Sequence, residues 1–178
     1  MTDSPTEPRP EPSLWTREGF RDDSWRHADT LGEAGANDRV ILPLAAFLAL
    51  DDDARAAAAG RLGVLLLPAE PVSVIEPFLK DLALVALAFP AFSDGRSYSK
   101  AELLRRAGFA GTLRATGDVL IDQVPHMLRT GFGEFEVKHP TALARLAEGR
   151  IGGIALQYQP AAVPSAAGEA YSWRRRRA

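Results

Sequence analysis

The chain has 178 residues, 46% of them hydrophobic, and a formal net charge of −2, which suits a soluble globular protein better than a nucleic-acid-binding one. It contains no cysteine, so disulfides, thiolate metal sites, iron–sulfur clusters and thiol nucleophiles are excluded. No apolar run approaches the ~20 residues of a membrane span, and the acidic, proline-rich N-terminus does not have the pattern of a signal peptide. We therefore expect a cytoplasmic protein without a membrane partner.

In chain order, we expect three parts. Residues 1–12 contain four prolines and little apolar surface, which predicts a disordered tail. Residues 13–160 are expected to form a single α/β domain, and residues 161–178 a flexible, basic C-terminal tail. Within the domain, large apolar side chains on both sides of Gly19 predict a short N-terminal β-hairpin at 13–28.

An alternation of predicted strands and helices begins at Arg39. Strands are expected to start near residues 40, 63, 82, 112, 134 and 154, and helices at 44–50, 51–59, 72–81, 99–106, 119–129 and 141–148. This spacing is typical of repeated β-α units. The predicted fold class is α/β, with a mainly parallel sheet of five to six strands between helices. We favour an open doubly wound sheet, and an incomplete barrel-like sheet is the alternative.

The longest connection between a strand and a helix, residues 90–98, follows the most apolar strand. Ligands of such folds bind where strands end, and a helix N-terminus and a guanidinium both attract anions. We therefore predict an anion-binding or ligand-binding site formed by Gly95, Arg96, Ser97, Tyr98 and Ser99, with Gln123 from the next connection. The open alternative is a structural turn in which Arg96 pairs with Asp94 and Ser99 caps the helix in a capping box with Glu102.

Two acids are the candidate catalytic residues. Asp94 and Asp118 each follow a predicted strand, and two carboxylates on one rim are suited to acid–base chemistry. The alternative for Asp118 is the N-cap of the following helix.

No cofactor or metal fingerprint is present. The sequence has no glycine-rich nucleotide-binding motif after a strand, and its three histidines, His27, His126 and His139, do not form a cluster. The i, i+4 pair of Asp122 and His126 lacks an accompanying nucleophilic serine. We predict no bound cofactor and no metal.

The C-terminus is aromatic and polybasic. We predict that it contacts an acidic partner protein through Trp173, Arg174, Arg175, Arg176 and Arg177. The alternative is a frayed, solubilising tail, and nucleic acid is not expected as a partner because the domain itself is not basic.

Three stretches carry a resemblance to a known family. They are FSDGRSYS at 92–99, GTLRATGDVLIDQ at 111–123, and the Gly-Phe pair at 131–132. The chain resembles the bacterial domain-of-unknown-function family 934, small proteins encoded beside assimilatory sulfite reductase, over about residues 14–160. Ser97 stands where the family usually has glycine, so this position does not require a backbone that only glycine adopts.

The resemblance implies a link to assimilatory sulfate and sulfite reduction. It favours an accessory protein that binds a small oxyanion or a reductase, with sulfite reductase and the reductase for activated sulfate as the expected partners. Because some family members carry the label oxidoreductase, the alternative is an oxidoreductase-type or other enzyme of sulfur metabolism with its active site on the C-terminal rim of the strands. The oligomeric state is left open.

Overall fold

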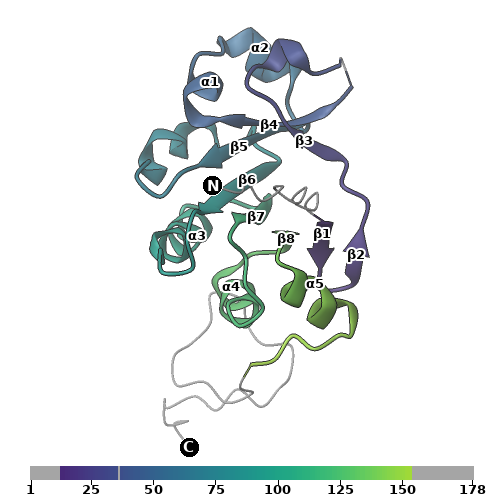
Figure 1. The fold of residues 1–178 in the computed structure, drawn as a ribbon. Helices are drawn as coiled ribbons and strands as arrows, with labels where there is room; N and C mark the ends of the chain where they lie inside the picture. The colour runs from purple at the N-terminus through teal and green to yellow at the C-terminus, as the bar shows by residue number, and fades with distance from the viewer. Residues whose placement is uncertain (1–12, 36, 154–178) are drawn as a thin grey trace, which may run out of the picture.

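The computed structural model describes residues 13–35 and 37–153. The strand predicted to start near residue 154 and the two predicted tails lie outside the described residues. The described part forms one eight-stranded sheet that curls into a half-barrel (Figure 1). Its strands are β1 (Ser13–Thr16), β2 (Gly19–Arg21), β3 (Trp25–His27), β4 (Arg39–Pro43), β5 (Leu62–Leu66), β6 (Leu84–Phe89), β7 (Thr112–Gly117) and β8 (Glu134–Val137).

The strands are ordered β2-β1-β8-β7-β6-β5-β4-β3 across the sheet. Strands β3 to β8 are parallel to one another, whereas β1 is antiparallel to both of its neighbours, β2 and β8. The N-terminal segment thus supplies both edges of the sheet, with β2 at one and β3 at the other. The predicted N-terminal hairpin is confirmed for β1 and β2, whereas residues 25–27 of the predicted segment 13–28 form β3, which pairs with β4.

The prediction of a mainly parallel sheet of five to six strands is wrong, because the sheet is mixed and has eight strands. Sequence spacing detects β-α repeats, but the three short N-terminal strands have no helix between them and do not follow that rhythm. The favoured doubly wound arrangement is also wrong. Strands β3 to β8 follow chain order without a switch point, as expected of the barrel-like alternative.

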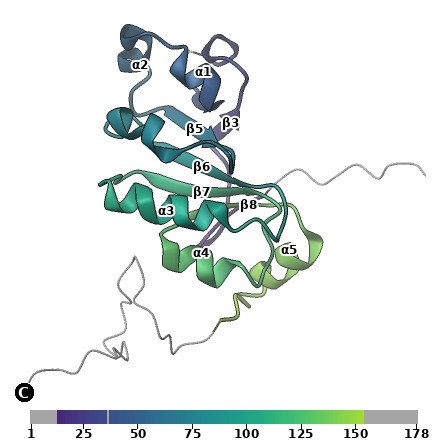
Figure 2. The same cartoon turned by 90° about the vertical axis from the view of Figure 1, so that its left-hand side faces the viewer.

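The helices lie on the convex side of the curl (Figures 1 and 2). They are α1 (Leu44–Leu48), α2 (Asp52–Ala57), α3 (Arg96–Arg106), α4 (Val124–Thr130) and α5 (Pro140–Ala147), with 3₁₀ turns η1 (Leu31–Glu33), η2 (Val72–Val74) and η3 (Glu76–Phe78). The main core contains apolar residues of α1, α3, α4 and α5 packed against the sheet. A smaller apolar cluster of Ile41, Leu84 and Ala86 lies apart from it, with Trp25 and Leu65 packed against it.

Three helix predictions need correction. The segment 72–81 forms two 3₁₀ turns rather than a helix, and Pro77 lies inside the second, where it offers no backbone N–H. Helix α4 begins at Val124 rather than residue 119, because Pro125 is accepted in the first turn of a helix and not in its interior. Helix α3 begins at Arg96, so Ser99 does not cap it and the capping box with Glu102 is not formed.

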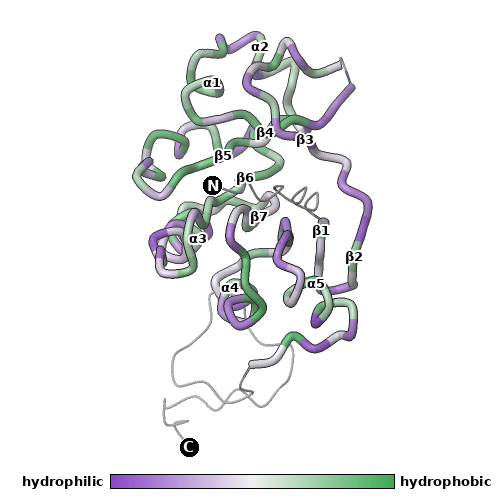
Figure 3. Tube along the Cα trace, viewed as in Figure 1, coloured by the Kyte–Doolittle hydropathy of each residue, from purple (hydrophilic) through white to green (hydrophobic). Residues whose placement is uncertain are grey.

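The residues along β5 and β6 are mostly hydrophobic, whereas the connection from β2 to β3 is mostly hydrophilic (Figure 3). This connection, residues 22–24, contributes a charged side chain to the concave side of the sheet, described below. No helix in the described part of the chain has the length and apolar character that crossing a bilayer requires.

Candidate functional site

The C-terminal ends of β4 to β8 meet at one rim of the half-barrel, and the predicted site residues follow them. In the loop after β6, Arg96 Nε and Nη2 donate hydrogen bonds to the two carboxylate oxygens of Asp94 at 2.9 and 2.7 Å. The bond from Arg96 holds the pKa of the Asp94 carboxyl below its usual value, and Asp94 raises the pKa of Arg96. This is the pairing expected of a structural turn.

Ser97 is fully buried, and its hydroxyl donates a 2.6 Å hydrogen bond to the carbonyl of Ala88. This bond joins the start of α3 to the end of β6. Gly95 is the N-cap of α3, and Ser99 is exposed in its first turn. Ser97 therefore has a structural contact of its own, and its φ is not positive.

Tyr98 packs between two rings. Its ring centroid lies 5.1 Å from that of Phe89 and 4.5 Å from that of His126. Burial, with a smaller contribution from the charge of Asp122, raises the pKa of Tyr98 to about 12, so the phenol is neutral at pH 7. Burial also lowers the pKa of His126.

The loops after β6 and β7 are joined by Gln123, whose Nε2 donates to the carbonyl of Phe92 at 3.0 Å. The backbone N–H of Asp118 donates to the carbonyl of Phe89 at 2.7 Å. Asp94 and Asp118 thus belong to neighbouring loops on one rim. The N-cap of α4 is Gln123, so the alternative that Asp118 caps this helix is wrong.

Gly117 permits this close approach of β6 and β7. Its φ is +100°, and a Cβ at this position would lie 2.4 Å from the carbonyl oxygen of Phe89. Only glycine is compatible with both the backbone angle and the contact.

Two large apolar side chains are exposed on the rim. Phe92 is 68% exposed in the loop after β6, and Leu67 is exposed directly after the neighbouring strand β5. Lys100 is buried beneath, and its ammonium donates to the carbonyls of Leu67 and Glu70. Lys100 therefore anchors the loop after β5 to α3, and the bond of Ser97 to Ala88 anchors the loop after β6 to its strand.

The remaining candidates contribute less to the rim. His139 is exposed at the N-cap of α5, and its carbonyl accepts from the N–H of Leu143. The predicted partner-binding residues Trp173 to Arg177 lie outside the described residues. Within the described part of the chain, no group of three or more His, Asp or Glu side chains is placed to hold a metal ion.

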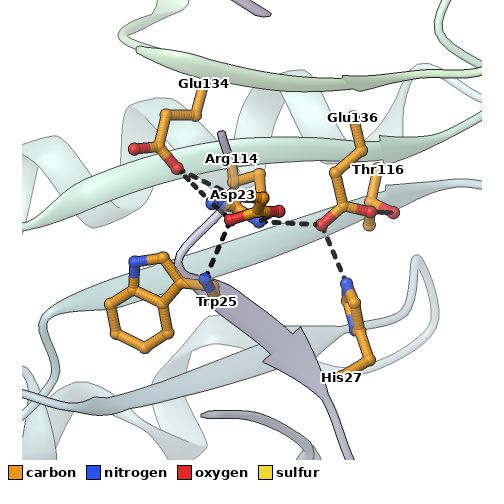
Figure 4. A network of polar contacts seen from close by, with 7 residues as sticks. All are labelled: Asp23, Trp25, His27, Arg114, Thr116, Glu134 and Glu136. Carbon is orange, nitrogen blue, oxygen red and sulfur yellow. Dashed lines mark hydrogen bonds and ion pairs between the residues drawn. The ribbon is translucent and has the colours of Figure 1, made fainter. Parts of the chain in front are cut away.

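A second cluster, on the concave side of the sheet, was not predicted (Figure 4). Its centre is Arg114 of β7, which is fully buried. The guanidinium makes five hydrogen bonds of 2.6–3.2 Å to three carboxylates, which belong to Asp23, Glu134 and Glu136. We call these residues, with Thr116 and His27, the Arg114 network.

Glu136 connects the network to the opposite edge of the sheet. One carboxylate oxygen lies 2.8 Å from His27 Nε2 on β3, and the other accepts from the Thr116 hydroxyl at 2.5 Å. Burial alone would raise the pKa of Glu136, but the contacts with His27 and Thr116 and the charge of Arg114 outweigh it and lower this pKa to about 2. The carboxylate is therefore ionised throughout the physiological range.

For Arg114 itself, burial alone would lower the pKa. The hydrogen bonds and charges of Asp23 and Glu134 outweigh burial and raise it. The guanidinium is thus permanently charged and fully engaged with protein carboxylates.

The sequence contains a signal for part of this network. Arg114 and Thr116 alternate with apolar residues on one buried strand, and Glu134 and Glu136 do so on the next. Charges two residues apart on buried strands face the same side of a sheet. The contributions of Asp23 and His27 have no such signal, because they depend on the curl that brings β3 across from β7 and β8.

Comparison with known proteins places the chain in a family. A model described as bacterial protein of unknown function (DUF934) matches residues 63–167, more than half of the chain. The chain belongs to the DUF934 family. This match confirms the family suggested by the motifs at 92–99 and 111–123. The matched residues include most of the rim and the β7 and β8 residues of the Arg114 network. No curated protein matches the sequence.

Proposed function

We propose that this DUF934 protein is a cytoplasmic accessory protein of assimilatory sulfate and sulfite reduction, and that it acts by binding a reductase at its rim. The pathway is the one implied by the resemblance of the motif residues to proteins encoded beside sulfite reductase. The observation that carries the binding surface is the exposure of Phe92 on the most motif-rich loop of the chain. Aromatic side chains are enriched at protein interaction sites, where they often contribute most of the binding energy.

The loop that carries Phe92 is held in place before any partner arrives. The buried Ser97 hydroxyl fixes its end to β6, and Gln123 holds the Phe92 carbonyl. Such a preorganised loop loses little conformational entropy when it binds. Exposed Leu67 on the neighbouring loop extends the apolar surface, and the Asp94–Arg96 pair adds polar groups to its border.

A small oxyanion is the less favoured ligand of the rim. Asp94 already occupies the edge of the Arg96 guanidinium formed by Nε and Nη2, so sulfate or sulfite at this edge would have to displace a carboxylate that lies two residues away in the same loop. The same pairing weakens the alternative of a rim enzyme, because Asp94 as a base would first have to leave its guanidinium.

The test is affinity capture of sulfite reductase and of the activated-sulfate reductase by the tagged full-length chain. We expect capture of a reductase, and at least a tenfold loss of affinity in Phe92→Asp, the effect of losing about 1.4 kcal/mol. Phe20→Asp is the matched control, because Phe20 is also exposed but lies on the hairpin strand β2.

Capture of neither reductase would contradict the proposal, as would equal losses in the two phenylalanine variants. Calorimetric titration with sulfate and sulfite addresses the oxyanion alternative. Binding of either anion that is lost in Arg96→Met would favour that alternative over a protein partner.

A further inference from the structure

The Arg114 network includes a paired carboxylate and imidazole that the proposed function does not use. His27 Nε2 and a Glu136 oxygen are 2.8 Å apart (Figure 4). The two residues come from β3 and β8, far apart in the sheet order, so only the curl of the sheet brings them together.

The carboxylate of this pair is buried and fixed. Glu136 receives hydrogen bonds from Thr116 on one oxygen and from Arg114 on the other. A buried carboxylate with both oxygens held cannot rotate away, so it fixes the orientation of the imidazole it contacts. Carboxylates hold catalytic histidines in this way, and they stabilise the positive charge that the ring acquires when it takes a proton.

The imidazole, in contrast, is accessible. The His27 side chain is 44% exposed. With Nε2 directed at Glu136, the proton of a neutral ring lies on Nε2 and the lone pair on Nδ1. Within residues 13–35 and 37–153, no side chain or backbone group forms a hydrogen bond with Nδ1. That nitrogen is available to a ligand.

The charges around His27 restrict which ligand it can serve. Three carboxylates surround the single guanidinium of Arg114, so the network carries a surplus of negative charge. An anion placed beside it would be repelled, whereas a neutral or cationic molecule would not.

We propose that His27 and Glu136 form a general acid–base pair for a neutral or cationic ligand at the concave side of the half-barrel. His27 Nδ1 accepts a proton from an O–H or N–H group of the ligand, and the bonding pair of electrons stays on the ligand's oxygen or nitrogen. The imidazolium is held by Glu136 and returns the proton from the same nitrogen, so the protein is unchanged after one cycle. Glu136 is a positioning residue in this scheme.

The first test uses the reactivity of the three histidines toward diethyl pyrocarbonate at about pH 8, where histidines with the usual pKa are neutral. The imidazole nitrogen attacks a carbonyl carbon, and ethanol and carbon dioxide leave. We expect His27 to be modified about tenfold faster than His139, which is exposed and has no carboxylate partner among the described residues. Equal rates for His27 and His139 in the wild-type protein would overturn the proposal.

Two variants distinguish a role of Glu136 in positioning His27 from a role in folding alone. Glu136→Gln keeps the shape but removes the charge, and we expect His27 to react at the rate of His139. Glu102→Gln makes the same change on α3, where the carboxylate pairs with Arg106 outside the Arg114 network, so His27 should stay fast. An unchanged His27 rate in a folded Glu136→Gln variant would refute the role of Glu136.

The ligand class is tested by titrating the His27 ring signals in NMR spectra with ethanolamine, a small cation with a hydroxyl group, and with sulfate. We expect ethanolamine to shift these signals and sulfate to leave them unchanged. A shift with sulfate, or none with ethanolamine, would contradict the assignment. Because the rim variant Phe92→Asp leaves the concave side intact, its effect on reductase capture reports on the proposed function alone.

Discussion

Replacement of Arg114 by methionine is the perturbation with the largest predicted effect on stability. The substitution preserves much of the side-chain length but removes all five hydrogen bonds to Asp23, Glu134 and Glu136. Removal of one partner from a buried ion pair costs about 3–5 kcal/mol, because a charge is left without compensation in a poorly solvated place.

The structure indicates where in that range the cost falls. The side chains of Asp23 and Glu134 are 30% and 22% exposed, so water can partly replace the guanidinium there. Glu136 is nearly completely buried and cannot be rehydrated in this way. We therefore expect a loss near the lower end, about 3 kcal/mol in the free energy of unfolding at pH 7.

The assay is urea unfolding followed by circular dichroism. With a slope of ~2 kcal/mol per molar urea, the midpoint should fall by about 1.5 M. Arg96→Met is the matched control. Arg96 also pairs with a carboxylate at 2.7 Å, but its side chain is 62% exposed, and exposed pairs contribute only ~0–1 kcal/mol. If both variants lost the same stability, or Arg114→Met lost less than about 1 kcal/mol, burial would not be the source of the effect.

Three further predictions follow from individual groups. Because the pKa of Glu136 is lowered to about 2 from 4.5, its contribution of about 3 kcal/mol is present above pH 4.5 and lost as the pH falls toward 2. Acid titration of stability should therefore be shallower in Glu136→Gln, and equal slopes would contradict this assignment. Gly117→Ala should destabilise the protein by at least about 2 kcal/mol in thermal unfolding, since φ is +100° and Phe89 blocks the new Cβ; a neutral effect would show that the loop adjusts. Burial raises the pKa of Tyr98 from 10 to about 12. The neutral buried phenol therefore contributes stability below pH 10, and this contribution is lost as the pH rises through 12. Ultraviolet titration should show one tyrosine ionising late, and its loss in Tyr98→Phe assigns it.

Sequence patterns predict the central strands of this protein well. The apolar run at Leu84–Phe89 and the β-branched run within Arg39–Pro43 form strands in the core of the sheet. Such strands are buried by helices, and the resulting continuous hydrophobicity is visible locally. Helix boundaries were predicted less well where proline decides them, as at Pro77 and Pro125.

The edges of the sheet and the Arg114 network could not be predicted in the same way. Strand β3 has only three residues and pairs with β4 rather than with its neighbour in sequence, β2. Its place follows from the tertiary contacts of Trp25, which packs against Gly63, and of the preceding Asp23, which pairs with Arg114. Contacts of this kind depend on the curvature of the whole sheet, which no local pattern encodes.

For the rim residues, the sequence pattern indicates where the distinctive loop lies but not what its side chains do. The motif around Asp94 and Arg96 marks the loop correctly as a distinctive part of the chain, but residue types alone did not decide between a ligand site and a turn. The geometry assigns the Asp94 and Arg96 side chains to each other and Ser97 to the backbone of β6. The large apolar side chain that remains exposed in this loop is Phe92, a residue that composition offers no reason to prefer.

Amide hydrogen exchange of the full-length chain, alone and with sulfite reductase, tests most directly whether the rim is the binding face. We expect the reductase to slow exchange in the rim loops at residues 67–71 and 90–99 and to leave β2 and β3 unchanged. Slower exchange at β2 or β3 with none at the rim, or no change anywhere with either reductase of the pathway, would contradict the account.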